Sequence, residues 1–477
     1  SDSVCITAAR GPCVRQPNFG LDMLLHEPKT QGVQLVSDLL SPSALDDPYA
    51  CYAQLRLAGP VHRVPGTDFY LAATWDAVQE AVSRPEDFSS NLTATLVTRG
   101  SQLAAFDMGA VDTAGHVLAT GDDPRHAHER KLVLPALVAK RIRALEPAIA
   151  DVARQLWQDG AAAGSIEWMS ALGDRLPMTL VARLIGLPDD DVPQLVQWGY
   201  GSTELLSGVF DLDHIAAAVE TSTQLAGYLY AKFAEAQANP GDDLLGDLAR
   251  AVAGNAVAPE VAVLMLVQLV GAGGESTAGL MGNAARLLAT HPDVQEQVRN
   301  DPQLVPALLE ETLRLESPFR NHHRHIRQDT TLDGVPLPKD GHLLLLWGSA
   351  NRDPAAFYDP DVLQLGRPNL RNHLAFGKGL HFCVGAALAR TEARIGSPHC
   401  WRPPTGSSSP TPNGYPASWC AGTGAWNCAT ADRHRGCRRP RHAASAPRCA
   451  AAAAPACGRT RSQCRPQPLS FRCQPRL

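Results

Sequence analysis

The pattern of apolar and polar positions divides the chain into an organised middle and two dissimilar ends. Apolar residues recur at helical spacing over residues 141–255, and Val261–Leu288 is the longest apolar stretch, so both regions predict helices. Residues 1–34 show no such periodicity and predict an irregular segment. Residues 396–477 contain no Val, Ile or Met, and such a segment cannot offset the entropy lost on ordering. We therefore expect one folded region over residues 35–395, followed by a low-complexity, disordered tail.

The first part of the folded region mixes short helices with short strands. Residues 89–120 are rich in Ser, Thr and Gly and predict a long loop, which in a globular chain is usually functional or mobile. The fold class that follows is mainly α with small β-sheets (α+β). The predicted helices are Asp47–Leu57, Trp75–Ser83 and one beginning at Asp122-Asp123-Pro124, and the predicted strands are Val61–Val64, Phe69–Ala73 and Leu343–Trp347.

Charge and composition exclude several classes of protein. The chain has 477 residues, of which 44% are hydrophobic, enough for the core of a large single-domain enzyme. The net charge of −5 combines +11 in residues 396–477 with −16 in the rest, and an acidic body argues against a nucleic-acid partner. No run of about 18 apolar residues and no secretory signal pattern occur, so we expect no membrane span.

Cysteine usage differs between the body and the tail. Eight of the twelve cysteines lie in residues 396–477, and none of their spacings is C-x-x-C, so a zinc site is not expected. The body has only Cys5, Cys13, Cys51 and Cys383, which suits a reducing cytoplasm.

The stretch from Phe376 to Gly385 carries the strongest chemical signal. Gly377 and Gly379 allow a tight turn, and Cys383 follows at the start of a helix-like run. Helix N-termini favour a thiolate, and a lone thiolate beside close backbone is what an iron porphyrin needs as an axial ligand. The alternative is a structural cysteine in a glycine turn.

Phe-Gly-x-Gly-x-His-x-Cys-x-Gly resembles the heme-binding loop of the cytochrome P450 family at all six fixed positions. The resemblance extends from about Leu35 to Ile395. Over this range the chain is similar to soluble actinobacterial members of the family, and residues 271–277 and 342–347 are similar to a mycobacterial branch. It implies the cytochrome P450 fold, a heme b cofactor and Cys383 as the iron ligand. Residues that the resemblance assigns to heme binding are His126, Arg130, Ala272, Gly273, Arg324, Phe376, Gly377, His381, Cys383 and Gly385.

Glycines interrupt the long apolar helix around residues 271–277. Two adjacent glycines in a helix cost about 1 kcal/mol each relative to alanine, which suggests a purpose such as close approach of a flat ligand or an opened turn. A dinucleotide fingerprint is a rival reading, but its third glycine is Ser276, and the next acid, Asp293, does not end a strand.

The same segment is similar to the distal-helix motif of the family. Ala272-Gly273-x-Glu275-Ser276 matches small residue, glycine, any, acid, hydroxyl, although serine stands where the family usually has threonine. The resemblance implies that Glu275 and Ser276, or the neighbouring Thr277, deliver protons to bound oxygen.

Further positions fit the family pattern. His126 and Arg130 are four apart and share one helix face, and the resemblance directs them, with Arg324 and His381, to the heme propionates. Taken alone, the two are ordinary solvated polar residues. Glu311 and Arg314 can pair along a helix, and the resemblance adds Arg367 to form the brace of the heme-binding core.

The family pattern ends near Ile395. The family continues with an apolar helix and a hairpin, whereas residues 396–477 consist mainly of Pro, Ala, Ser, Arg and Cys. Two readings remain open, a shifted reading frame and a genuine basic disordered tail. Either reading removes the C-terminal hairpin.

The resemblance implies a heme-thiolate monooxygenase that activates O2 and hydroxylates a hydrophobic small molecule. Electrons are expected from a ferredoxin and its NAD(P)H-dependent reductase, because no flavin or iron–sulfur segment is fused to the chain. Two alternatives remain: a non-catalytic heme binder or inactive product, owing to the altered C-terminus, and a related enzyme such as a peroxygenase, isomerase or dehydratase.

Overall fold

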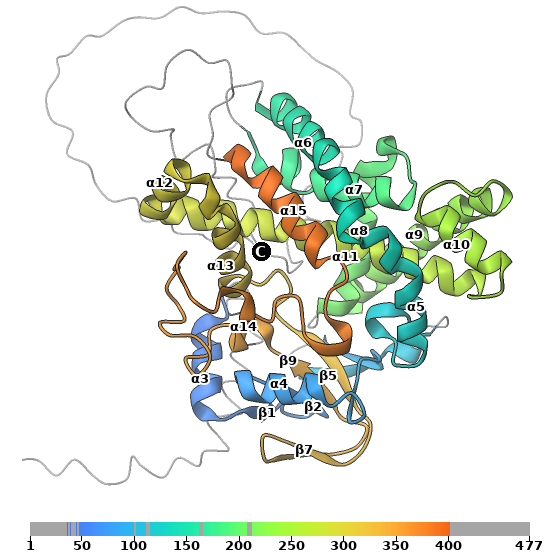
Figure 1. Cartoon of the computed structure of the whole chain (residues 1–477). Coiled ribbons are helices and arrows are strands. Elements are labelled where there is room, and N and C mark those ends of the chain that lie inside the picture. Colours follow the sequence, from blue (N-terminus) through green and yellow to red (C-terminus); the bar gives the residue numbers. More distant parts are fainter. Residues whose placement is uncertain are drawn as a thin grey trace, which may run out of the picture. The chain divides into compact units, whose positions relative to one another are not determined.

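A computed structural model describes residues 36, 39, 44, 47–99, 102–110, 115–161, 166–207 and 212–400 of the chain (Figure 1). The chain divides into two units, 1–431 and 432–477, and every described residue belongs to the first. The predicted irregular segment 1–34 lies outside the described residues, as does the tail from residue 401 onward. The described structure continues past Ile395 through Gly396 and a 3-10 turn over Ser397–Cys400.

Helices make up most of this unit, as predicted. Helix α11 packs against α7, α8, α9, α13 and α15, so it is the central element around which the others gather (Figure 1). The helices are α3 Tyr49–Ala58, α4 Trp75–Ser83, α5 Arg125–Val133, α6 Ala139–Ala161, α7 Arg175–Ile185, α8 Val192–Ser207, α9 Leu212–Ala238, α10 Leu244–Ala253, α11 Pro259–Thr290, α12 Pro292–Asn300, α13 Val305–Leu315, α14 Trp347–Ala350 and α15 Ala386–Gly396.

A five-stranded sheet joins segments that are far apart in the sequence. Its strand order is β1-β2-β9-β6-β3, with β2 and β9 parallel and the other pairs antiparallel. Helices α3 and α4 contact α14 beside this sheet (Figure 1). Two-stranded sheets are formed by β4 with β5 and by β7 with β8. The strands are β1 Val61–Arg63, β2 Phe69–Ala72, β3 Phe88–Ser89, β4 Ala94–Arg99, β5 Gln102–Asp107, β6 His322–Ile326, β7 Thr330–Leu332, β8 Val335–Leu337 and β9 His342–Leu345.

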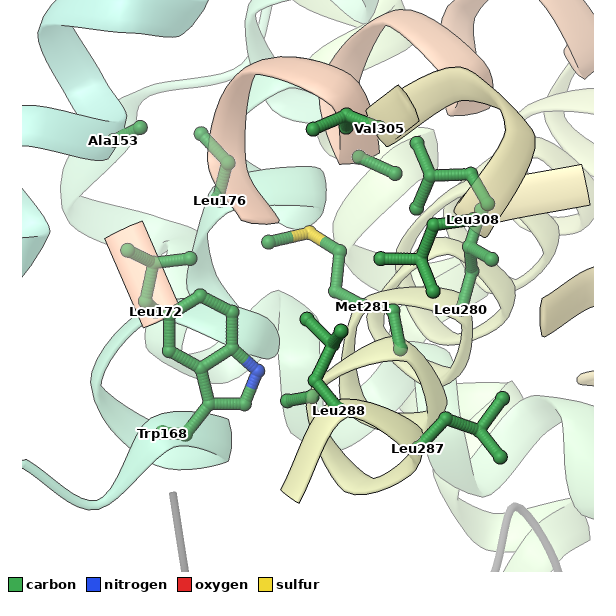
Figure 2. Close-up of a cluster of buried hydrophobic side chains, with 14 of the residues drawn as sticks. Ala153, Trp168, Leu172, Leu176, Leu280, Met281, Leu287, Leu288, Val305 and Leu308 are labelled. Carbon is green, nitrogen blue, oxygen red and sulfur yellow. The ribbon is translucent and has the colours of Figure 1, made fainter. Parts of the chain in front are cut away.

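The main hydrophobic core fixes α11 and α15 against their neighbours. Met281 of α11 lies between Leu176 of α7 and Leu308 of α13, and Trp168 closes the cluster beside Leu288 (Figure 2). Burying side chains of this size stabilises a fold by roughly 1.5–3 kcal/mol each. This core holds the helix that follows the Cys383 loop.

The glycines of α11 allow neighbouring helices to pack closely, and they do not open the turn that was one of the two predicted purposes. The helix is continuous over Pro259–Thr290, so no turn is opened. A Cβ at Gly273 would lie 2.5 Å from Cγ2 of Val181, and one at Gly274 would lie 2.3 Å from Cε of Met178, both on α7. Likewise, a Cβ at Gly271 would meet Thr203 on α8. These glycines therefore allow helices α7 and α8 to pack closely against α11, and Gly271 and Gly273 also line the cavity described below.

The predicted loop over residues 89–120 is wrong in its first half. Ala94–Arg99 and Gln102–Asp107 form an antiparallel hairpin with Leu96 opposite Ala105. The run Thr95-Leu96-Val97-Thr98 contains three β-branched residues, which favour a strand, but the abundance of small polar residues around it obscured this signal.

Helix α11 is the one described helix that is long and apolar enough to cross a membrane by length and composition. It is mostly buried inside the unit, with Ala284 and Met265 fully covered. A core helix of a globular protein passes the same test, so α11 is explained by its packing.

Candidate active site

A cavity of about 590 Å³ lies between α11 and the loop that carries Cys383. Helices α5, α8 and α9, strand β6 and residues 115–120 complete its wall. It collects nearly all the residues singled out in the sequence. Those that line it are His126, Arg130, Ala272, Gly273, Ser276, Thr277, Arg324, Phe376, Gly377, His381, Cys383 and Gly385.

The Cys383 loop is shaped by two glycines and one backbone hydrogen bond. Gly377 and Gly379 have φ angles of 65° and 69°, which glycine adopts without strain. The Cys383 N–H donates to the Phe376 carbonyl at 2.9 Å, which closes the loop, and α15 then begins at Ala386. Cys383 has accessible surface because it lines the cavity, although the surrounding protein encloses its thiol.

The pKa of the Cys383 thiol is shifted upward, whereas its place before a helix predicted a downward shift. Burial raises its pKa, and this effect outweighs the hydrogen bonds from the backbone N–H groups of Gly385 and Ala386, which lower it. The backbone N–H groups at the start of α15 thus lower the pKa of Cys383, as predicted, but the effect of burial is larger. A bound metal cation, by contrast, deprotonates a coordinating thiol outright.

Basic side chains gather at one end of the cavity. Arg324 is bonded through Nη1 to the His323 carbonyl at 2.7 Å, and Arg130 through Nη2 to the Phe382 carbonyl at 2.8 Å. The rings of His126 and His381 lie 4.2 Å apart. Within the described part of the chain, no carboxylate forms an ion pair with Arg324, Arg130 or His381.

Helix α11 presents hydroxyl groups to the cavity. Ser276 Oγ donates to the Ala272 carbonyl at 2.8 Å, and Thr277 lines the wall one residue further on. Glu275 does not line the cavity. It is buried behind the wall, where the Thr203 hydroxyl of α8 donates to its carboxylate.

Comparisons with known proteins agree with this geometry. Residues 250–400 match the family model described as Cytochrome P450. Cytochrome P450 144 of Mycobacterium tuberculosis is 54% identical over 353 residues, which cover 74% of this chain and 81% of that protein. The chain belongs to the cytochrome P450 family. It therefore has the P450 fold, a heme-iron cofactor and the monooxygenase class of oxidoreductase activity.

Other P450s are also similar. The erythromycin C-12 hydroxylase of Saccharopolyspora erythraea is 37% identical over 290 residues, covering 60% of this chain and 72% of that protein. The structure of CYP109E1 from Bacillus megaterium in complex with testosterone has a TM-score of 0.67 and 29% identity, covering 75% of this chain and 90% of that one.

The residues present fit a heme. Burial lowers the pKa of Arg324 to about 10, although Asp122 acts to raise it, and no carboxylate of the described residues forms an ion pair with Arg324. Burial also lowers the pKa of His381, to about 3, with further lowering by Arg324 and His126. A group with two carboxylates would compensate this end of the cavity, and its metal would meet the Cys383 thiol.

Glu311, Arg314 and Arg367 form a buried cluster beneath the site. Arg314 Nε and Arg367 Nε reach the same Glu311 oxygen at 2.7 and 2.9 Å, and the side chains are at most 2% exposed. The remaining guanidinium hydrogens bind carbonyls of residues 351–362. The cluster joins α13 to the segment that precedes the Cys383 loop.

Sequence reasoning did not assign Trp347, Glu392 or Thr203 to the site. Trp347 Nε1 donates to Nδ1 of His322 at 2.6 Å, and both side chains line the cavity. Glu392 of α15 also lines it, and burial raises its pKa well above the usual value. Thr203 is 72 residues from Glu275, so no local pattern could have paired them.

Proposed function

We propose that this P450 binds heme b and inserts one oxygen atom of O2 into a hydrophobic small molecule. The observation that carries the proposal is one cavity that holds the Cys383 thiol together with Arg324 and Arg130, neither of which forms an ion pair with a carboxylate among the described residues. When bound, the heme supplies the redox chemistry that activates O2.

The residues of the cavity divide the task of holding the cofactor. Cys383 is the metal ligand, and Phe376 shields its sulfur. At the basic end of the cavity, Arg130 and Arg324 bind the two carboxylates of the cofactor by charge-assisted hydrogen bonds, and His126 and His381 add ring N–H donors. Gly377 and Gly385 keep the loop close without side chains, while Ala272 and Gly273 leave room on the opposite wall.

Proton delivery is assigned to α11. Ser276 and Thr277 present hydroxyl groups at the cavity wall, and Glu275, the residue before Ser276, is buried behind that wall. In this proposal the Glu275 carboxylate rotates away from Thr203 and exchanges a proton with the Ser276 hydroxyl. This gives Glu275 the role of proton source and Ser276 or Thr277 the role of donor into the cavity.

The rest of the cavity wall favours a neutral, hydrophobic substrate. Leu264, Val267 and Val219 line it, and several hydroxyl groups are already bonded within their own helices. Ser202 donates to the Gly199 carbonyl and Thr223 to the Val219 carbonyl, both at 2.8 Å. Such side chains offer methyl groups and acceptor oxygens but no free charge. The similar proteins named for testosterone and erythromycin support a substrate of this kind.

Electrons are proposed to come from a ferredoxin and its NAD(P)H-dependent reductase in the cytoplasm. Lys378 of the Cys383 loop and Lys131 of α5 supply positive charge for an acidic partner on the Cys383 side. Both lie near a redox centre held at Cys383, since Lys378 is five residues from it and Arg130, next to Lys131, bonds the Phe382 carbonyl.

Turnover with isotopically labelled O2 tests the proposal. The purified protein is supplied with a ferredoxin, its reductase, NADPH and a panel of hydrophobic molecules, beside a Cys383→Ala variant. We expect products that carry one labelled oxygen atom and depend on both ferredoxin and Cys383. Product formed only with hydrogen peroxide would instead indicate a peroxygenase, and heme uptake without product under either condition would indicate a non-catalytic heme binder.

A further inference from the structure

Two consecutive carboxylates of α13 bind different segments of the chain. Glu311 binds Arg314 and Arg367, as described above. Glu310 turns to another side of the helix and binds His373 and Arg390. Because neighbouring helix positions do not share a face, the two carboxylates anchor separate segments.

Glu310 contacts both flanks of the Cys383 loop. His373, three residues before Phe376, donates through Nε2 to Glu310 Oε2 at 3.0 Å. Arg390, on the helix after the loop, grips the same carboxylate with Nε at 2.6 Å and Nη2 at 2.9 Å. Such a bidentate pair fixes orientation as well as distance.

The incoming flank is held in one arrangement. The Ala375 N–H donates to Nδ1 of His373 at 3.2 Å, so the ring proton lies on Nε2 and points at Glu310. The Leu374 N–H donates to Asn351 Oδ1 at 2.7 Å. The backbone therefore enters the loop from a fixed position.

The outgoing flank reaches Phe376. The Arg390 guanidinium lies 4.4 Å from the centroid of the Phe376 ring, a cation–π contact. The Phe376 carbonyl in turn accepts the N–H of Cys383 at 2.9 Å. Direct contacts thus run without a gap from Glu310 through Arg390 and Phe376 to Cys383.

Glu310 is ionised in this network. Burial alone would raise its pKa, but hydrogen bonds from Arg390 and His373 outweigh burial and lower the pKa to about 2. The pair of Glu310 and Arg390 therefore places one negative and one positive charge beside the loop, and His373 stays neutral because Nδ1 is an acceptor.

We propose that Glu310 is a positioning residue for the axial thiolate, and that the Glu310–Arg390 pair sets the reduction potential of the iron bound at Cys383. This inference rests on the proposed role of Cys383 as the iron ligand. Holding both flanks fixes the sulfur, and the balance of the two charges fixes the local electrostatic potential.

The inference is tested by removing the negative charge of Glu310 in one variant and the positive charge of Arg390 in another. Reduction potentials and ferrous carbon monoxide spectra are measured for the heme-loaded full chain and for Glu310→Gln, Arg390→Gln and Arg390→Lys. Removing the negative charge should shift the potential to more positive values, and removing the positive charge should shift it to more negative values. Arg390→Lys keeps the charge and should stay near the wild type in potential, with a smaller fraction of the thiolate band.

Glu316→Gln is the matched control. Glu316 is another buried carboxylate held by two arginines, Arg286 and Arg352, and among the described residues it forms no hydrogen bond or ion pair with the Cys383 loop. We expect no shift of potential in this variant. If Glu310→Gln does not take up heme, the inference is tested by Arg390→Gln and Arg390→Lys. Arg390→Gln should then have a more negative reduction potential than Arg390→Lys.

Shifts of the same sign in Glu310→Gln and Arg390→Gln, or potentials and thiolate bands equal to the wild type, would overturn the inference. Equal reduction potentials in Arg390→Gln and Arg390→Lys would also overturn the inference. The failure of the proposed function looks different, because the wild-type chain itself would then lack a thiolate band.

Discussion

The indole of Trp347 donates its Nε1 hydrogen to Nδ1 of His322 across 2.6 Å. An indole can only donate, so Nδ1 must be an acceptor and the ring hydrogen of His322 lies on Nε2. Burial, together with Arg324 and His323, lowers the pKa of His322 to about 3, so the ring is neutral near pH 7. The cavity therefore has a fixed, uncharged N–H donor that Trp347 holds in place.

Replacing Trp347 with phenylalanine should leave Nδ1 of His322 buried and unpaired. The expected loss in free energy of unfolding is about 1–3 kcal/mol, measured by urea denaturation. Trp198→Phe is the control, because the Trp198 indole bonds to Gln224 at an exposed position and its loss should cost less than about 1 kcal/mol. Equal losses in the two variants would argue against a special role for the buried pair.

Glu311→Gln should be far more damaging than the removal of a surface ion pair. Arg314 is fully buried and Arg367 nearly so, and the change leaves their charges without the carboxylate, at a cost of about 3–5 kcal/mol. The comparison is Asp68→Asn, which breaks the exposed pair with Arg63 and should cost at most about 1 kcal/mol. Urea denaturation of both variants measures the difference, and similar losses would contradict the structural role of the cluster.

Acid should destabilise the protein partly through His323. Burial lowers the pKa of His323 to about 4, with further lowering by His342 and Arg324, and neither ring nitrogen has a hydrogen-bond partner among the described residues. Below pH 6.5 the unfolded chain binds a proton at this ring that the folded chain does not, so stability falls as the pH drops from about 6.5 to about 4.

His323→Leu should remove this contribution. Between pH 6.5 and pH 5 the variant should lose about 2 kcal/mol less stability than the wild type. Above pH 7 the two proteins should change in parallel. Denaturation curves at several pH values measure the effect, and identical pH dependence below pH 6.5 would refute the assignment.

Alanine substitutions at two helix glycines should have opposite effects. Gly227 of α9 has no atom within 4 Å of an added Cβ, so Gly227→Ala should stabilise the protein by about 0.5–1 kcal/mol. Gly273→Ala should destabilise it by about 1–3 kcal/mol, because the added Cβ would lie 2.5 Å from the stiff side chain of Val181. Val181→Ala in the same chain should relieve the clash, and a gain in stability from Gly273→Ala alone would contradict the close packing of α7 on α11.

The sequence predicted the elements that have strong local signals. Trp75–Ser83 was predicted with the bounds that the structure shows, because its apolar positions are periodic and Thr74 caps it. The Cys383 loop was found from glycine spacing and one cysteine. The hairpin of β4 and β5 was missed because neither strand alternates strictly between apolar and polar residues, and the segment around them is rich in Ser, Thr and Gly.

Contacts between distant segments could not be predicted in the same way. Nothing near Gly273 in the sequence indicates that Val181 lies against it, and nothing near Glu310 indicates that Arg390 returns to it 80 residues later. Burial decides the pKa of Cys383 against the helix start, and burial is a property of the whole fold. Periodicity and spacing report on local structure, whereas these features arise from tertiary packing.

The ferrous carbon monoxide difference spectrum of the full chain, beside Cys383→Ala, tests the central claim most directly. We predict a red-shifted Soret band in the wild type, which reports an iron–thiolate bond, and its absence in the variant. An unshifted wild-type band, or a red-shifted band that survives in Cys383→Ala, would contradict the assignment of Cys383 as the iron ligand.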